Sequence, residues 1–288
     1  MFSVKLVNED GISKNINDGE SYVIVGMTGL TPPSANHYTS KSHNKHGVKY
    51  NGYSIDERTI TISIKLLGDV EENRNALYNW IESGQYVKIH YSNGVRNVYC
   101  EGHVVVPDAD FFTDNEIIEL EVMCPDPYFK SFESIIAEVD NVEPMFYFTE
   151  EDDDVYFATE EEGVPFSEES NSNLTTIINN GSESGVLITV LALDDITTLE
   201  IYNGENPATE FIKLKSGKTL RKGQKLVIDT TGVRNKITID GENALSSFGR
   251  NITWFKLKKG RNSFYTEPAV NMSKMRMTIE YNERWLGV

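Results

Sequence analysis

The chain has 288 residues, of which 39% are apolar and 10% aromatic, and its formal net charge is −17. A chain of this length usually forms more than one core, so we expect two domains, and the apolar content excludes a chain that is disordered throughout. No apolar run approaches the roughly 20 residues of a membrane span. The N-terminus lacks the pattern of a secretory signal, so we expect synthesis in the cytoplasm.

The negative charge is concentrated in one segment. Ser131–Ile212 contains twenty Asp and Glu and no Lys, Arg or His, whereas the rest of the chain has 27 cations and the other 24 of the 44 acids. A segment of this charge repels phosphate groups. We therefore expect neither specific nucleic-acid binding nor binding to an anionic membrane surface.

The first 130 residues have the pattern of β-strands with one helix. Short β-branched runs at Phe2–Val7 and Ser21–Met27 predict strands. Two later runs, "RTITISIKLLG" and "EIIELEVMC", alternate apolar with polar residues, which predicts strands with one buried face. The predicted buried positions of the first run are Ile60, Ile62, Ile64 and Leu66. Those of the second run are Ile118, Leu120, Val122 and Cys124. The pair Asn93-Gly94 predicts a hairpin turn. The long polar stretch "GLTPPSANHYTSKSHNKHGVKYNGY" indicates an arm or a functional loop.

One helix is expected within "DVEENRNALYNWIESG". Asp69 and Glu72 have the spacing of a capping box, in which each side chain satisfies a free N–H of the first turn. Leu77, Trp80 and Ile81 recur at the spacing of one buried helical face, and Ser83-Gly84 ends the helix. The only two cysteines, Cys100 and Cys124, lie in strand-like runs and are interpreted as buried apolar side chains.

The acidic stretch "FYFTEEDDDVYFATEEEGVPFSEES" (Phe146–Ser170) repeats a Phe at nine-residue spacing, at positions 148, 157 and 166. It lacks the oxygen-ligand spacing and glycine of a calcium loop. We interpret it as a seam between two domains, with its aromatic side chains against a surface and its carboxylates in water. A disordered tether and an adventitious cation are the alternatives.

Beyond this stretch the sequence consists of short strands separated by turns, at a spacing of about ten residues, which favours a β-sandwich or jelly roll. We therefore predict a mainly β fold: an N-terminal β domain with one α-helix (1–135), an acidic linker (136–170) and a C-terminal β-sandwich (171–288).

No catalytic, cofactor or metal motif stands out. The pair His43 and His46 lies beside Lys41 and Lys45, which repel a cation. A pair of glycosidase carboxylates could be hidden among the many acids, although nothing selects two of them. We predict no catalytic residue, no cofactor and no metal ligand. Trp254 and Trp285 are candidates for stacking on a saccharide ring, although Trp254 also fits a core and Trp285 a docked terminal strand.

Several runs together resemble the distal tail proteins of phages. They are "RTITISIKLLG", the single helix, the hairpin and "LEVMCPDPYFK", then "EEGVPFSEESNSNLTTIINNGSESGVLITVLAL" and the closing "KLVIDT…GENALS…ITWFKLKKGRNSF…IEYNERWLGV". The resemblance spans nearly the whole chain, but the acid-rich connection departs from the family pattern.

The resemblance implies a structural virion protein of a tail tip or baseplate. N-terminal domains would form a homo-oligomeric ring, a hexamer, at the end of the tail tube. C-terminal galectin-like sandwiches would dock receptor-binding or fibre proteins, and the partners would include the tail tube and tail hub. Whether the tail is contractile, non-contractile or part of a phage-derived bacteriocin stays open. The alternatives are a carbohydrate-binding module of a cell-wall-targeting protein and a hydrolase of cell-wall glycans.

Overall fold

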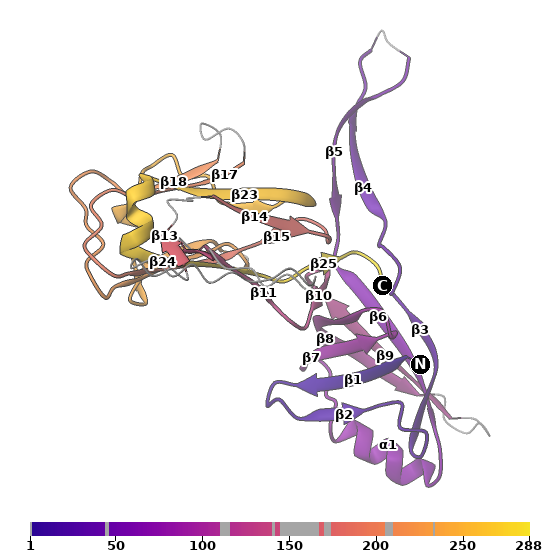
Figure 1. Cartoon of the computed structure of the whole chain (residues 1–288). Coiled ribbons are helices and arrows are strands. Elements are labelled where there is room, and N and C mark those ends of the chain that lie inside the picture. Colours follow the sequence, from indigo (N-terminus) through magenta and orange to yellow (C-terminus); the bar gives the residue numbers. More distant parts are fainter. Residues whose placement is uncertain are drawn as a thin grey trace, which may run out of the picture. The chain divides into compact units, whose positions relative to one another are not determined.

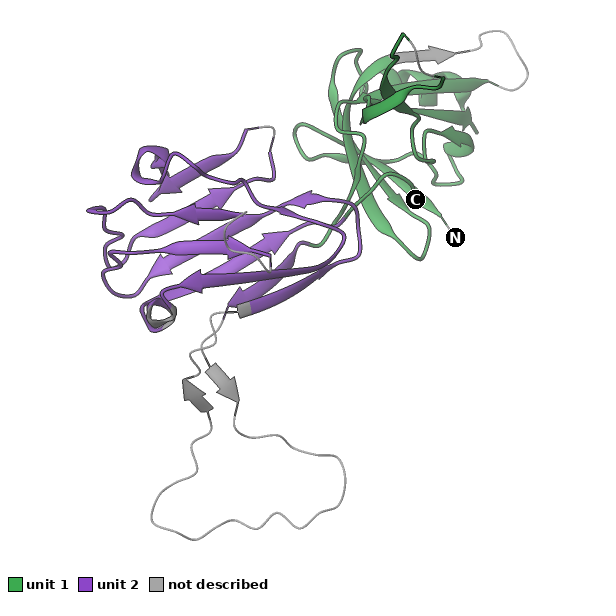
Figure 2. Cartoon of the chain, turned by 90° about the horizontal axis from the view of Figure 1, so that it is seen from above, with its two compact units in different colours: residues 1–133, 284–288 green, residues 134–283 purple. Residues whose placement is uncertain are grey.

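The structure is a computed structural model of the chain, and it describes residues 2–43, 46–109, 116–139, 142–144, 167–169, 174–204, 210–232 and 234–288. These residues are mainly β, as the sequence predicts. They divide into two compact units (Figure 2): unit 1 is Met1–Glu133 with Arg284–Val288, and unit 2 is Ser134–Glu283. None of the helices in the described part has the length and apolarity to cross a membrane.

A nine-stranded sheet is the main element of unit 1 (Figure 1), with the order β2-β1-β7-β8-β9-β6-β3; β10 also pairs with β8, and β25 pairs with β10. Its strands are β1 (Ser3–Asn8), β2 (Ser13–Asn15), β3 (Tyr22–Thr28), β6 (Arg58–Leu66), β7 (Tyr86–Ser92), β8 (Asn97–Ala109), β9 (Ile117–Cys124), β10 (Phe129–Ser131) and β25 (Arg284–Trp285). The pairs within it are antiparallel.

The buried face of this sheet is the one that the alternation predicts. The four predicted positions of β6 and the four of β9 are all buried, and the two strands pair with Ile62 opposite Leu120. The hairpin between β7 and β8 turns at Asn93-Gly94, as predicted. The Asn93 Oδ1 atom accepts hydrogen bonds from the backbone N–H groups of Val95 and Arg96 at 3.0 and 2.8 Å. Burial of alternate β-branched side chains on one face fixes the strand register.

The predicted helix is present as α1 (Val70–Tyr78), but the predicted stop at Ser83-Gly84 is wrong, since the helix ends before Trp80 and Ile81. Asp69 is its N-cap and accepts a hydrogen bond from the backbone N–H of Glu72 at 3.2 Å. Leu77 is fully buried, and Ile81, just beyond the helix, is also buried in the core of unit 1. Tyr22 of β3 donates its hydroxyl to the carbonyl of Asn73, which ties the helix to the sheet.

Unit 2 contains two larger sheets that share one core (Figure 1). One sheet has the order β11-β24-β16-β19-β20-β21 and the other β14-β23-β17-β18. Their strands are β11 (Ile135–Val139), β14 (Leu174–Asn179), β16 (Leu187–Ala192), β17 (Glu200–Asn203), β18 (Phe211–Lys213), β19 (Lys225–Asp229), β20 (Lys236–Ile239), β21 (Glu242–Asn243), β23 (Gly260–Glu267) and β24 (Met275–Tyr281). The buried Ile188 and Val190 come from the first sheet, and Ile201 and Phe264 from the second. This is the arrangement of a β-sandwich.

Smaller elements complete unit 2. Two strand pairs are β12 (Val142–Pro144) with β13 (Ser167–Glu169), and β15 (Ser184–Gly185) with β22 (Lys256–Leu257). Two 3₁₀ helices are η1 (Leu245–Ser247) and η2 (Ala269–Lys274). Of the acidic stretch Phe146–Ser170, only Ser167–Glu169 belongs to the described residues, so the predicted seam, with its three phenylalanines, lies outside them.

Two details differ from the predicted division of the chain. The prediction placed residues 284–288 in the C-terminal sandwich, but they group with unit 1, because β25 pairs with β10 and Trp285 packs against the core of that unit. The prediction began the linker at residue 136, but β11 pairs with β24 through Val139. A two-residue strand and an edge strand have too little periodicity to be recognised from sequence.

Candidate functional site

The long polar stretch of the sequence forms a two-stranded ribbon that extends from unit 1 (Figure 1), here called the arm (residues 35–55). It consists of β4 (Ala35–Ser40) and β5 (Lys49–Ile55), which pair with each other and with no other described strand. Gly52 adopts a φ of 135°, near the register shift between Tyr38 and Thr39. A lone two-stranded ribbon is marginally stable in water, so it needs further contacts.

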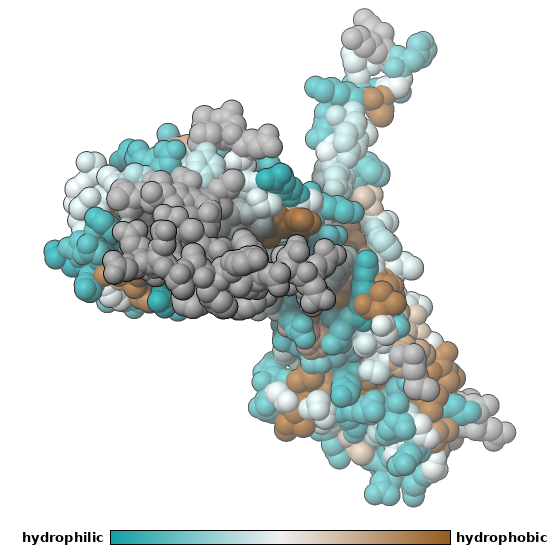
Figure 3. All heavy atoms as spheres, in the orientation of Figure 1, coloured by the Kyte–Doolittle hydropathy of each residue, from teal (hydrophilic) through white to brown (hydrophobic). Residues whose placement is uncertain are grey.

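The arm exposes large side chains to solvent. Four of them have exposed fractions between 55 and 62%: Tyr38, Val48, Tyr50 and Tyr53. The space-filling view shows an arm surface that is mostly hydrophilic, with isolated apolar side chains (Figure 3). Between residues 35 and 55 the sequence has three lysines and no Asp or Glu. Tyrosine offers large contact area with a polar tip, so this surface is suited to a protein partner.

Arg58 fixes the base of the arm. Its side chain is buried, and its guanidinium donates to four backbone carbonyls: Pro127 at 2.8 Å, Thr31 at 2.9 Å, Gly29 and Leu286. The guanidinium also lies 4.6 Å from the centre of the Phe129 ring. Burial lowers the pKa of Arg58, with Cys100 and Cys124 acting in the opposite direction. One residue therefore joins the chain before the arm to the C-terminal segment.

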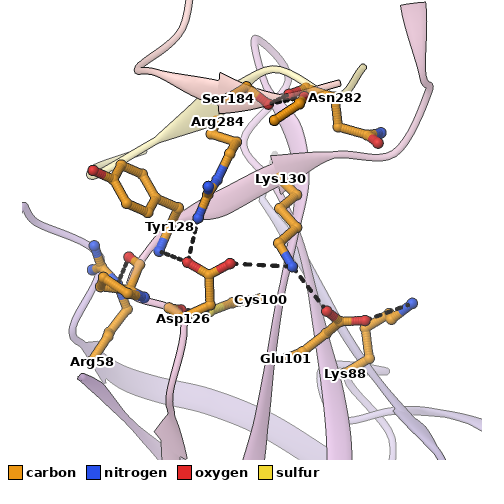
Figure 4. A network of polar contacts seen from close by, with 12 residues as sticks. Arg58, Lys88, Cys100, Glu101, Asp126, Tyr128, Lys130, Ser184, Asn282 and Arg284 are labelled. Carbon is orange, nitrogen blue, oxygen red and sulfur yellow. Dashed lines mark hydrogen bonds and ion pairs between the residues drawn. The ribbon is translucent and has the colours of Figure 1, made fainter. Parts of the chain in front are cut away.

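A second polar cluster holds β25 in unit 1 (Figure 4); it is called here the Asp126 network. Asp126 accepts from Arg284 Nη2 at 2.5 Å and pairs with Lys130 Nζ at 3.3 Å. Lys130 Nζ also contacts Glu101 at 3.1 Å, and Glu101 in turn pairs with Lys88 at 3.3 Å. Cations and carboxylates thus alternate along the cluster, so each charge has an opposite neighbour.

Two pKa shifts follow from this alternation. Burial acts to raise the pKa of Glu101, but Lys130, the hydroxyl of Tyr86 and Lys88 outweigh it and lower the pKa of that carboxyl. Burial acts to lower the pKa of Lys130, but Asp126 and Glu101 outweigh it and raise that pKa. Both shifts favour the charged forms, which is the behaviour of a structural ion cluster rather than of a general acid or base.

The two candidate saccharide residues lie in different units. Trp285 belongs to β25, is half-buried against the core of unit 1, and has the Arg96 guanidinium 5.0 Å from its ring centre. Trp254 is half-buried against the core of unit 2 and lines a pocket of about 820 Å³. Each tryptophan therefore packs against the core of its own unit.

The sequence predicts the arm region as an arm or functional loop, but it does not single out the tyrosines there. It also gives no prediction of the roles of Arg58 and the Asp126 network. One signal for Arg58 was present: it continues the buried phase of Ile60 and Ile62 at two-residue spacing, where a charged side chain needs buried partners. Nothing local marked Asp126 or Arg284, because the two residues are 158 positions apart. Within the described part, no group of three or more His, Cys, Asp or Glu is placed to hold a metal ion.

Two family models match the sequence, and together they cover most of it. Residues 9–178 match the phage tail protein RIFT-related domain. Residues 182–285 match the C-terminal domain of siphovirus-type tail components. No curated protein matches the chain.

The fold is similar to those of two solved phage proteins. One is the crystal structure of the Dit protein of phage SPP1, which superposes with a TM-score of 0.70 at 13% identity, over 99% of each chain. That protein is described as a paradigm of the hub adsorption apparatus in phages that infect Gram-positive bacteria. A chain of the baseplate of phage P2, in its activated conformation with Ca, superposes with a TM-score of 0.51 at 11% identity, over 100% of each chain. At these identities the likeness concerns the fold.

Proposed function

We infer the function from one premise: the chain belongs to the siphovirus-type family of phage distal tail proteins, whose models match residues 9–178 and 182–285. It is therefore a structural component of a phage tail, of the hub or baseplate class. The sequence resemblance predicted this family, and the prediction is confirmed.

We propose that copies of the chain close into a ring of six at the end of the tail tube, with unit 1 forming the ring. The observation that carries this proposal is the arm, a cationic ribbon with exposed tyrosines that lacks a described partner strand. The edges of the main sheet add support. Among the described strands, β3 pairs only with β6 and β2 only with β1, so both offer free backbone groups to a neighbouring copy.

Unit 2 is proposed to dock receptor-binding or fibre proteins. Two β-branched side chains support a contact surface there: Ile136 of β11 is 59% exposed and Ile178 of β14 is 62% exposed. Exposed isoleucines on a sandwich favour burial against another protein. The similar SPP1 protein is described as part of a hub adsorption apparatus, and such a role is consistent with a docking surface.

The proposed role is architectural and involves no catalysis. In the charged cluster of unit 1, the pKa values of Glu101 and Lys130 are shifted toward the ionised forms, and the cations and carboxylates of the cluster pair with one another. A scaffold needs such rigid charge pairing, whereas a hydrolase needs a carboxyl whose pKa is raised toward the working pH. The same role places the protein in the virion tail after its synthesis in the host cytoplasm.

Light scattering coupled to size-exclusion chromatography tests the ring. The wild-type chain is expected to elute as a closed assembly of about six subunits. The triple variant Tyr38→Ser, Tyr50→Ser, Tyr53→Ser removes the exposed rings of the arm and is expected to elute as smaller species at equal concentration. Its far-UV circular dichroism should stay unchanged, because these side chains are exposed in the isolated subunit. Its thermal midpoint should fall only by the stability that assembly gives the wild type.

A matched control is Val95→Ser in the β7–β8 turn, which is 91% exposed and distant from the arm in sequence. This variant should retain the wild-type mass. A wild-type chain that stays monomeric at every concentration, or a triple variant with an unchanged mass, would contradict the role of the arm. Release of reducing sugar from a host envelope by the purified chain would instead support the hydrolase alternative.

A further inference from the structure

We propose that the pocket lined by Trp254 in unit 2 binds a saccharide that carries a negative charge, as a phosphate or a carboxylate group. This inference is independent of the ring, since the pocket lies within unit 2. It also gives the carbohydrate-binding alternative a defined position in the molecule.

The pocket has walls that are held in place by the backbone. The loop that follows η1 is fixed beside β18 by a β-bridge between Leu214 and Phe248. Two backbone hydrogen bonds of 3.0 Å add to it: Gly249 N donates to the Lys213 carbonyl, and Lys215 N donates to the Ser247 carbonyl. The Lys215 ammonium also donates to the Ser246 carbonyl at 2.7 Å. A pocket that exists before binding loses less free energy to ordering when a ligand arrives.

One part of the lining is apolar. Trp254 and Ile252 pack against the core of unit 2 with part of their surface still accessible, Phe248 is buried, and Leu245 is 44% exposed. A half-buried indole that is fixed by the core offers a flat face. The C–H face of a pyranose ring stacks on such a surface.

The other part is polar and positive. Lys215 and Arg250 line the pocket together with Asn243 and Ser246, and no carboxylate is among the described residues that form it. Arg250 is exposed and has no hydrogen-bond or ion-pair partner among the described residues. A guanidinium binds phosphate or carboxylate through two parallel hydrogen bonds. The amide and hydroxyl groups supply partners for sugar hydroxyls.

The preference for an anion comes from the charges that line the pocket. Unit 2 as a whole has 15 Lys and Arg against 25 Asp and Glu, so the unit as a whole does not attract anions. Lys215 and Arg250 are the charged residues among the described lining, and a neutral sugar gains nothing from their positive charge, whereas an anionic one does. The combination of an indole, hydrogen-bonding side chains and an unpaired Arg therefore selects a charged saccharide over a neutral sugar or a bare anion.

Ligand-observed saturation-transfer NMR on the full-length protein tests the proposal, because it works for an assembly of any size. Four probes separate the contributions: glucose 6-phosphate, glucuronate, glucose and inorganic phosphate. Glucose 6-phosphate, glucuronate or both should bind. Glucose should bind with about tenfold lower affinity, because it cannot form the charge-assisted hydrogen bond. Which of the two charged sugars binds identifies the anionic group. Inorganic phosphate should displace them only at about tenfold higher concentration.

Variants then assign the binding to this pocket. Arg250→Gln changes an exposed position and leaves the fold intact. It should lower the affinity for the charged sugars about tenfold and leave the affinity for glucose unchanged. Trp254→Leu keeps apolar packing and should weaken every sugar while leaving displacement by phosphate unaltered. Two controls, Arg276→Gln on the exposed face of β24 and Trp285→Phe in unit 1, should bind as wild type.

Three results would overturn the proposal. The first is the lack of any transfer signal from the sugars. The second is equal displacement by inorganic phosphate and glucose 6-phosphate, which would mean an adventitious ion only. The third is unchanged binding of the charged sugars by Arg250→Gln, which would place the contact elsewhere. Arg250→Gln answers the question even if Trp254→Leu fails to fold.

Discussion

Arg58 shows how one side chain can stabilise segments that are distant in sequence. It is 2% exposed, and its guanidinium serves carbonyls on both sides of the arm and near the C-terminus. Replacement by methionine keeps the length and apolar stem but removes every donor. Each buried carbonyl left without a donor costs about 1–3 kcal/mol.

We therefore expect Arg58→Met to lower the free energy of unfolding of unit 1 by at least about 3 kcal/mol. Arg58→Lys should lower the free energy of unfolding by less, because its ammonium keeps the charge. Some loss is still expected, since the ammonium cannot reach all four carbonyls. Urea titration followed by tryptophan fluorescence would measure the change, with Trp254→Phe as the background so that Trp80 and Trp285 report on unit 1. The exposed control Arg276→Met should change the value by less than about 0.5 kcal/mol.

Glu101 leads to a pH prediction. Its pKa is lowered in the folded chain, since Lys130, Tyr86 and Lys88 outweigh the opposing effect of burial. A carboxyl with a lowered folded pKa stabilises the fold fully above its unfolded value, about 4.3, and loses this contribution as the pH falls through the lower folded value. Urea midpoints measured between pH 7 and pH 3 should therefore fall on the acid side.

The variant Glu101→Gln isolates that contribution. It cannot ionise, so its midpoint should be lower than that of wild type at pH 7 and should approach the wild-type value as the solution is acidified. Parallel curves for the two proteins across the whole range would mean that Glu101 contributes nothing to the pH dependence. Glu119→Gln, at an exposed position of β9, is the matched control and should follow the wild-type curve.

At the scale of elements, local patterns predict what local forces determine. The alternation of β6 and β9, the Asp69 cap of α1 and the turn at Asn93-Gly94 were all predictable, because each depends on residues close together in the chain. The arm was recognised only as a long polar stretch. Its strands have no buried face to impose alternation, so "ANHYTS" and "KYNGYSI" lack the period of a packed strand.

The candidate binding sites were less predictable for the same reason. Trp254 could be proposed as a stacking residue from its type, but the pocket needs Lys215 and Arg250 beside it, and these come from different turns. Trp285 has the same residue type and lies against Arg96 on the core of unit 1. Only tertiary packing distinguishes the two, and a sequence pattern does not record it.

At the scale of the whole molecule, the chain ends in the unit where it begins. Unit 2 is inserted between Glu133 and Arg284, so both of its ends are tied to unit 1. The last residues are held mainly through their backbone: Arg96 donates to the Gly287 carbonyl at 2.7 Å, Arg58 donates to the Leu286 carbonyl, and Val288 N donates to the Leu30 carbonyl at 3.2 Å. A short tail can therefore matter more than its length suggests.

We expect deletion of residues 286–288 to destabilise unit 1, because Arg58 and Arg96 each lose one backbone carbonyl to which they donate. Leu286→Ala keeps every backbone acceptor and should cost much less. Gly287→Ala is expected to behave like the deletion: an added Cβ would lie 2.7 Å from Pro32 Cδ, so the tail would have to shift away. Differential scanning calorimetry of the three variants would measure the effect on unit 1. Equal midpoints for the deletion and Leu286→Ala would show that the backbone contacts are dispensable and that the tail is a passive end of the chain.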